Sequence, residues 1–277
     1  MWDNTALLVL LVWPGVVVGC ALLNMLISWT FSWSELVVDY LIGIIIGASF
    51  VAGTDVDASG LANFFLTASH GLVGLLKWLG ADSLADPETM FKWSAGLMAG
   101  ATVYSAALDH GSVAIGHDTG APFFSILLLP VKLTFAIFTT IVGLLIMVVG
   151  MIARGAKDEA DDNGDDWFAF IGGSLFFSWG NDGLHATTFG WVVNVFESTI
   201  ADVMEHELYH SRQYIYQHDW LGVFYFTFGA LWGLISSAIE GQSDGKSFDS
   251  SFAFRAEVDG GTEVGNPIEA AAYRLAP

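Results

Sequence analysis

Residues 4–34 read N-T-A-L-L-V-L-L-V-W-P-G-V-V-V-G-C-A-L-L-N-M-L-I-S-W-T-F-S-W-S, and none of these side chains carries a charge. Residues 133–153 and 220–239 form two further uncharged runs. Each run is long enough for one crossing, since a helix needs about 20 apolar residues to span the hydrocarbon core of a bilayer. A mean hydropathy of +0.57, with 14% charged residues, places most of this chain in a membrane.

The apolar pattern predicts a mainly α integral membrane protein with about four to five transmembrane helices and a small α/β module near the C-terminus. Residues 61–80 suggest a helix lying on or shallowly in the membrane. Lys132, in the last of the expected N-terminal spans, would extend its amine toward the lipid headgroups. The spans expected before the module are 5–28, 35–53, 90–115 and 130–153.

Three segments follow from this pattern. We expect a transmembrane helical domain over residues 1–155, an acidic linker over 156–166 and the module over 167–277, which includes the membrane-embedded hydrophobic segment 220–240. Within the module, residues 167–177 and 184–196 resemble strands or a hairpin, because they are rich in aromatic and β-branched residues and flank a turn-forming stretch at 179–183.

The formal net charge of −20 comes from 29 acidic and nine basic residues. A chain this acidic is a poor partner for nucleic acid, which repels it. This acidity indicates a protein of the cell membrane of a salt-adapted prokaryote, where salt screens the repulsion between its own charges. The simpler alternative is that the charge reflects only an acidic linker and acidic loops. The few basic residues near the spans, Lys77, Lys92, Arg154 and Lys157, place their connections in the cytoplasm.

Residues 206–210 read H-E-L-Y-H. In a helix this H-E-x-x-H spacing sets two imidazoles one turn apart on one face, beside a carboxylate. Seven His and ten Glu in 277 residues make about 0.006 such matches expected by chance, so chance is a poor explanation. The pattern predicts a Zn²⁺ site with His206 and His210 as ligands and Glu207 as general base, although a non-catalytic zinc site has the same spacing.

Residues 206–214, H-E-L-Y-H-S-R-Q-Y, and residues 266–273, N-P-I-E-A-A-A-Y, together resemble a group of membrane-associated metallopeptidase-like proteins of the gluzincin type. The resemblance covers roughly residues 184–275. It implies a zincin-like module in which His206, His210 and Glu269 hold the zinc ion and Glu207 is the base. Such proteins often carry an acidic residue where Ala271 stands, which braces a ligand histidine.

Several auxiliary roles follow. The segment 186–195 stands where zincin-like sites carry a sheet-edge strand, which could bind an extended peptide. An interior strand, or a membrane-surface segment that packs Trp191, is an equal alternative. Gln213 shares the helix face of the two histidines. His185 and His218 could approach the site as hydrogen-bond donors to the transition state.

The hydrophobic segment raises a topological question. A single crossing by residues 220–239 would leave Glu269 on the opposite side of the membrane from His206. We therefore expect a re-entrant or broken hairpin, or a helix buried beneath the site. If the segment is instead a simple span, Glu240 or Asp219 becomes the alternative third ligand.

The leading hypothesis is a membrane-embedded zinc metallopeptidase that hydrolyses peptide bonds near the membrane surface, with its zinc site facing the cytoplasm. Its partners would be the lipid bilayer and a peptide or protein substrate. The rival is a non-catalytic structural or accessory subunit of a membrane complex that retains the metal site and binds partner subunits. A weaker third hypothesis is a transporter that uses intramembrane charges such as Glu35 and Asp39, which are more simply interfacial caps.

Overall fold

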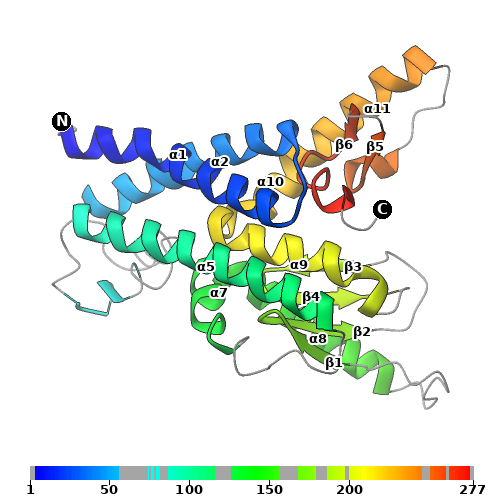
Figure 1. Cartoon of the computed structure of the whole chain (residues 1–277), viewed down its shortest axis with the longest axis horizontal. Coiled ribbons are helices and arrows are strands. Elements are labelled where there is room, and N and C mark those ends of the chain that lie inside the picture. Colours follow the sequence, from blue (N-terminus) through cyan, green and yellow to red (C-terminus); the bar gives the residue numbers. More distant parts are fainter. Residues whose placement is uncertain are drawn as a thin grey trace.

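The computed structural model describes residues 4–55, 74, 76–77, 79–81, 87–115, 126–155, 168–178, 186–196, 200–244, 250–259 and 262–274. The described chain is mostly helical, with a four-stranded and a two-stranded sheet in its C-terminal half (Figure 1). The expected surface helix at 61–80 and the acidic linker at 156–166 fall almost wholly outside these residues. The principal helices are α1 (Asn4–Ile27), α2 (Trp33–Asp55), α5 (Pro87–Ile115), α7 (Leu129–Phe135), α8 (Ile137–Gly155), α9 (Ile200–Gln217), α10 (Trp220–Phe224) and α11 (Ala230–Asp244).

Helices α1 and α2 form an apolar hairpin (Figure 1). The turn between them exposes Trp29 and Trp33, the kind of side chain that favours a membrane interface. Glu263, from the C-terminal sheet, caps α2 by accepting hydrogen bonds from Ser34 Oγ at 2.6 Å and Ser32 Oγ at 2.9 Å. This cap fixes the start of α2 against a segment more than two hundred residues away.

The described residues contain fewer spans than the four to five expected. Among the described residues, three stretches are long and apolar enough to cross a membrane: Leu10–Ile27, Trp33–Val51 and Trp220–Ile239. The expected span at 90–115 does form a helix, α5, but its interior is too rich in small and polar side chains to join these three.

The expected span at 130–153 is broken. Ala136 leaves the helical conformation between α7 and α8, with φ −131° and ψ 49°. Asp219 accepts hydrogen bonds there from the backbone N–H groups of Phe138 (3.2 Å) and Thr139 (2.8 Å), which starts a new helix. The remaining apolar part, Ile137–Ile152, is shorter than a membrane span and packs on the sheet.

Each of the two segments expected to contain strands forms a β-hairpin. Strands β1 (Phe168–Ile171) and β2 (Ser174–Ser178) pair antiparallel, as do β3 (Ala186–Phe189) and β4 (Val192–Val195), and β2 runs parallel to β4. Positive φ values at Gly172 and Gly173 form the first tight turn. The order β1-β2-β4-β3 leaves β3 at an edge and β4 inside the described sheet.

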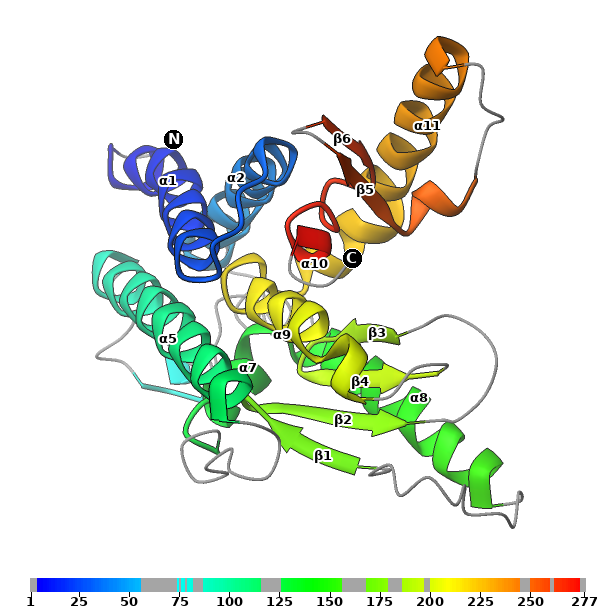
Figure 2. The same cartoon turned by 45° about the vertical axis from the view of Figure 1, so that its right-hand side comes forward.

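Helix α9 lies at the centre of the molecule. One side packs on the sheet and the other on α1, α2 and α5, while α8 covers the opposite face of the sheet (Figure 2). Lys132 of α7 is 2% exposed and does not reach toward headgroups as expected. Its Nζ instead donates to Gly172 O and to Ser211 Oγ, each at 2.9 Å, because these buried oxygens satisfy the ammonium. Lys132 thus joins α7, the sheet and α9.

Residues 220–244 form neither a re-entrant hairpin nor a buried helix. Helix α10 continues through a π-helical turn, η3 (Tyr225–Gly229), into α11, and much of the surface of this helix is exposed. The chain then returns beside α11 through η4 (Ser250–Ala253), β5 (Ala256–Asp259) and β6 (Thr262–Gly265), where Gly265 N donates to Ser236 Oγ at 2.8 Å. This return brings Glu269 back to α9.

Candidate metal centre

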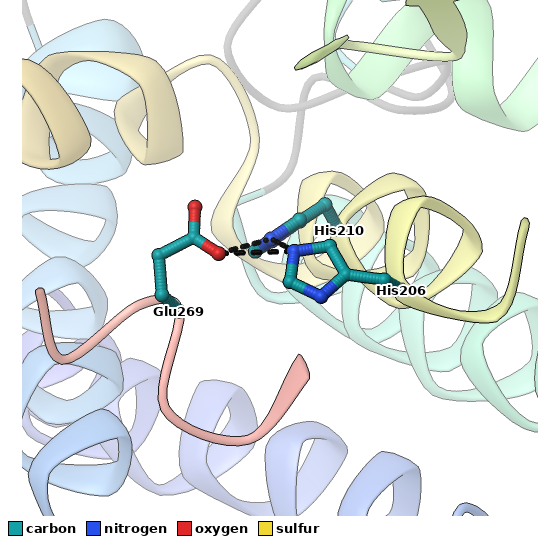
Figure 3. A group of neighbouring side chains, drawn as sticks. All are labelled: His206, His210 and Glu269. Atoms are coloured by element: carbon teal, nitrogen blue, oxygen red, sulfur yellow. Dashed lines mark hydrogen bonds and ion pairs between the residues drawn. The ribbon is translucent and has the colours of Figure 1, made fainter. Parts of the chain in front are cut away.

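Three side chains converge where α9 meets the returning C-terminal segment. His206 Nε2 and His210 Nε2 lie 3.0 Å and 3.1 Å from Glu269 Oε2, and 3.1 Å from each other (Figure 3). The two histidines are one turn apart on α9, so their rings leave the helix on the same side. Of the described residues, these three form the group of His, Cys, Asp or Glu side chains that could hold a metal ion.

The triangle has the size of one face of a metal tetrahedron. Ligand atoms about 2.05 Å from a tetrahedral zinc ion lie ~3.3 Å apart, close to the three separations here. Two imidazole nitrogens and one carboxylate oxygen are also ligands that zinc accepts. The donor set therefore fits a three-ligand site, the number that leaves a fourth position for water or substrate.

A tight turn carries Glu269 to the histidines. Asn266 Oδ1 accepts a hydrogen bond from Ile268 N at 3.1 Å, and its Nδ2 donates to Ala253 O at 3.0 Å. The turn presses on the helix at Gly229, where an added Cβ would meet Asn266 Oδ1 at 2.5 Å. After Pro267 the chain forms a run of turns that ends in a 3₁₀ turn, Ala272–Arg274.

Tyr225 and Tyr273 enclose the carboxylate. Tyr225 Oη, in the π-helical turn, donates to Glu269 Oε1 at 2.6 Å, so the two oxygens of this carboxylate have separate partners. The Tyr273 ring meets the His206 ring edge-on, with centroids 4.9 Å apart. Burial and the Glu269 charge raise the pKa of Tyr273 to about 12, so it keeps its proton.

The buried charges in the triangle stabilise one another. Burial alone lowers the pKa of His210, but the Glu269 carboxylate raises it more strongly, and the resulting pKa is about 9. Burial raises the pKa of Glu269, yet the two imidazoles lower it further, to well below its ordinary value. In the metal-free protein at neutral pH, a proton on His210 therefore stands where the metal charge would be.

Gln213 braces the metal-facing nitrogen. His210 Nδ1 donates to Gln213 Oε1 at 2.6 Å, which turns Nε2 toward Glu269. The Gln213 amide then donates to Glu35 Oε1 at 2.8 Å. Gln213 thus supplies the brace that the resemblance assigns to an acidic residue at position 271, where Ala271 is buried beside Tyr209.

Glu207 lies beside the triangle and is 4% exposed. Its Oε2 accepts a short hydrogen bond from Thr188 Oγ1 of β3, the edge strand. The electrostatic influence of Glu207 reaches His210, Tyr225 and Tyr273. The expected base is therefore held between the metal candidate and the sheet edge.

The other sequence candidates lie elsewhere. His218 follows His210 by eight residues, a rise of about 12 Å, and stacks on Phe135 with ring centroids 4.7 Å apart. Asp219 caps α8, so it is not the third ligand. Glu240 belongs to α11, and its side chain is outside the description, as is His185.

Sequence reasoning assigned no role to Thr188, Tyr225 or Tyr273. Tyr273 ends the motif N-P-I-E-A-A-A-Y and Thr188 lies in the segment 186–195, so both were within quoted stretches. Tyr225 reaches the site through long-range packing, and no motif contains it. Comparisons of the chain with protein families, with curated proteins and with solved structures find no match.

Proposed function

We propose that this protein is a membrane-embedded zinc metallopeptidase that hydrolyses peptide bonds near the membrane surface. The observation that carries the proposal is the triangle of His206 Nε2, His210 Nε2 and Glu269 Oε2 with Glu207 beside it. The H-E-x-x-H motif and its resemblance to gluzincin-type proteins support the same assignment. A bound zinc ion would polarise the scissile carbonyl and make water acidic enough to ionise near neutral pH.

The side chains around the triangle would do the remaining work. Glu207 would accept the proton of the attacking water and pass it to the leaving amine. Thr188 holds the Glu207 carboxylate in one orientation. Tyr225, whose hydroxyl donates to Glu269 Oε1, is a positioning residue for that ligand.

The depth of the site supports a substrate close to the bilayer. Glu35 stands near the start of the apolar stretch Trp33–Val51, and Tyr225 near the start of Trp220–Ile239. Glu35 is linked through Gln213 to His210, and Tyr225 is bonded to Glu269. These links join the triangle to the first turns of two apolar helices, and the exposed Trp29 and Trp33 at the start of one of them are the kind of side chain that favours a membrane interface.

The edge strand β3 supports a peptide as the substrate. A peptide added beside β3 would receive main-chain hydrogen bonds from the sheet, and Thr188 of that strand touches the proposed base. Main-chain pairing accepts many side chains, so this geometry favours a polypeptide over a small molecule.

Metal content tests the site first. The purified protein, kept in high salt because of its acidity and without chelator, is expected to carry about one zinc ion per chain. Glu269→Ala should lose the zinc ion, whereas Glu205→Gln, which changes an acid of α9 next to His206, should keep it. Wild-type protein without zinc would reject the proposal.

Peptide hydrolysis tests the reaction. Glu207→Gln should retain zinc but lose at least about a hundredfold of activity against a peptide library in lipid nanodiscs. Full activity in this variant would reject Glu207 as the base. Zinc-loaded wild-type protein that cleaves no peptide would favour the structural or accessory subunit.

A further inference from the structure

Beyond the metal centre, α9 faces α2 through two carboxyl–carboxamide contacts. Gln213 Nε2 donates to Glu35 Oε1 at 2.8 Å, and Gln217 Nε2 donates to Asp39 Oδ1 at 2.6 Å. Glu35 and Asp39 are four residues apart in α2, and Gln213 and Gln217 are four apart in α9, so the two contacts lie one helical turn apart on facing sides of the helices. We call these four residues the acid–amide ladder.

The ladder is fully buried, with an exposed fraction of 0% for all four side chains. Among the described residues, three of its oxygens accept no hydrogen bond: Glu35 Oε2, Asp39 Oδ2 and Gln217 Oε1. A buried acceptor left without a donor costs about 1–3 kcal/mol, and more when it is charged. All three orphan atoms are acceptors, so they need a proton or another positive group.

Two of the orphan oxygens belong to groups that already touch. Asp39 Oδ1 is bonded to Gln217 Nε2, while Asp39 Oδ2 and Gln217 Oε1 are the second heteroatoms of the same carboxyl and carboxamide. A carboxylate cannot donate to the amide oxygen, but a carboxylic acid can. One proton on Asp39 Oδ2 would therefore satisfy both acceptors.

The surrounding charges favour Asp39 over Glu35 as the group that takes the proton. Glu35 Oε1 accepts two hydrogen bonds, from Gln213 and from Tyr209 Oη at 3.0 Å, and the Arg212 guanidinium lies over the Tyr209 ring. The His210 imidazole also interacts electrostatically with Glu35, while Asp39 Oδ1 accepts a hydrogen bond from Gln217. Asp39 interacts electrostatically with Glu35 of its own helix and with Cys20 of α1. From α9, the hydroxyls of Tyr209 and Tyr216 also interact with it. Helix α10, which packs on α2 as well, has no titratable side chain.

We propose that Asp39 is a proton-binding site in which Oδ2 carries a proton taken from solvent and donates it to Gln217 Oε1, closing a cyclic acid–amide pair. Glu35 keeps the hydrogen bonds that its Oε1 accepts from Gln213 and Tyr209. The neutral pair lets α2 enter the membrane without a second buried anion and fixes its register on α9. This inference holds whether or not the metal centre hydrolyses peptides.

Infrared difference spectroscopy in lipid nanodiscs tests the proposal. Wild-type protein at pH 7 should show the C=O stretching band of a protonated carboxyl, and the band should shift in D₂O. Asp39→Asn should lose it, because the asparagine amide replaces the acid as donor to Gln217, which also preserves the fold. Glu88→Gln, which removes an exposed carboxyl paired with Lys92, should keep the band.

Three results would overturn the assignment. The first is wild-type protein without the band at pH 7, a measurement that needs no variant. The second is a band that survives Asp39→Asn or disappears in Glu35→Gln, which would put the proton elsewhere. The third is a band removed by adding Na⁺ or Ca²⁺, which would identify a metal cation as the ligand of these oxygens.

Discussion

The metal centre and the acid–amide ladder occupy consecutive turns of one face of α9, yet they solve the burial of acids differently. His206 and His210 meet one carboxylate and can take up positive charge themselves. Gln213 and Gln217 meet two carboxylates and can take up none. Histidines can therefore share positive charge with a buried carboxylate, or join it in holding a metal ion, whereas Gln217 leaves Asp39 in need of the proton proposed above.

The largest expected effect is the pH dependence of zinc binding. Zinc must displace the proton of His210, whose pKa is about 9. Affinity should therefore fall about tenfold for each pH unit below 9, or about 300-fold by pH 6.5. Competition with a chromophoric chelator of known protonation measures this. Gln217→Ala should show the same slope, and a pH-independent affinity would contradict the proton on His210.

Gly229→Ala should break the metal centre from a distance. The added Cβ would displace Asn266 and the turn that carries Glu269. Such overpacking costs about 1–3 kcal/mol, which is equivalent to a five- to 150-fold loss of zinc affinity. Gly100→Ala, in α5, meets nothing within 4 Å and should leave zinc affinity unchanged. Equal affinities of the two variants would show that this turn does not position Glu269.

The two glutamines should separate the two regions. Gln213→Ala removes the brace on His210 and should weaken zinc binding about 10- to 100-fold, as loss of such braces typically does. Gln217→Ala should change zinc affinity less than about twofold, because its amide contacts Asp39. Titration calorimetry of both variants makes the comparison. Similar losses in both would mean that the ladder and the metal centre act as one unit.

The smallest effect is expected at the edge strand. Thr188→Val removes the hydroxyl that orients Glu207 and should lower peptide hydrolysis about tenfold, about 1.4 kcal/mol in the barrier, without changing zinc content. Thr187→Val, one residue earlier in β3, is the matched control. A loss of zinc in Thr188→Val would place this hydroxyl in the metal site.

The sequence predicted the parts of the site that lie within short motifs. The turn-to-turn spacing of His206 and His210 and the position of Gln213 follow from helical periodicity, and the resemblance located Glu269. The break at Ala136 escaped prediction because its cause is Asp219, 80 residues away from Thr139. Glu35 and Asp39 pair with residues of α9 that are 178 positions away in the sequence, so from their place in the first turns of α2 they were interpreted as simple caps.

The return of the chain along α11 also sets an order of biosynthesis. His210 and Glu269 are separated by 59 residues, and the apolar stretch Trp220–Ile239 lies between them. A ribosome releases both histidines before this stretch and the third ligand after it. The complete triangle therefore forms only once that helix and the returning C-terminal segment have both folded, so metal binding by all three side chains would report that both are in place.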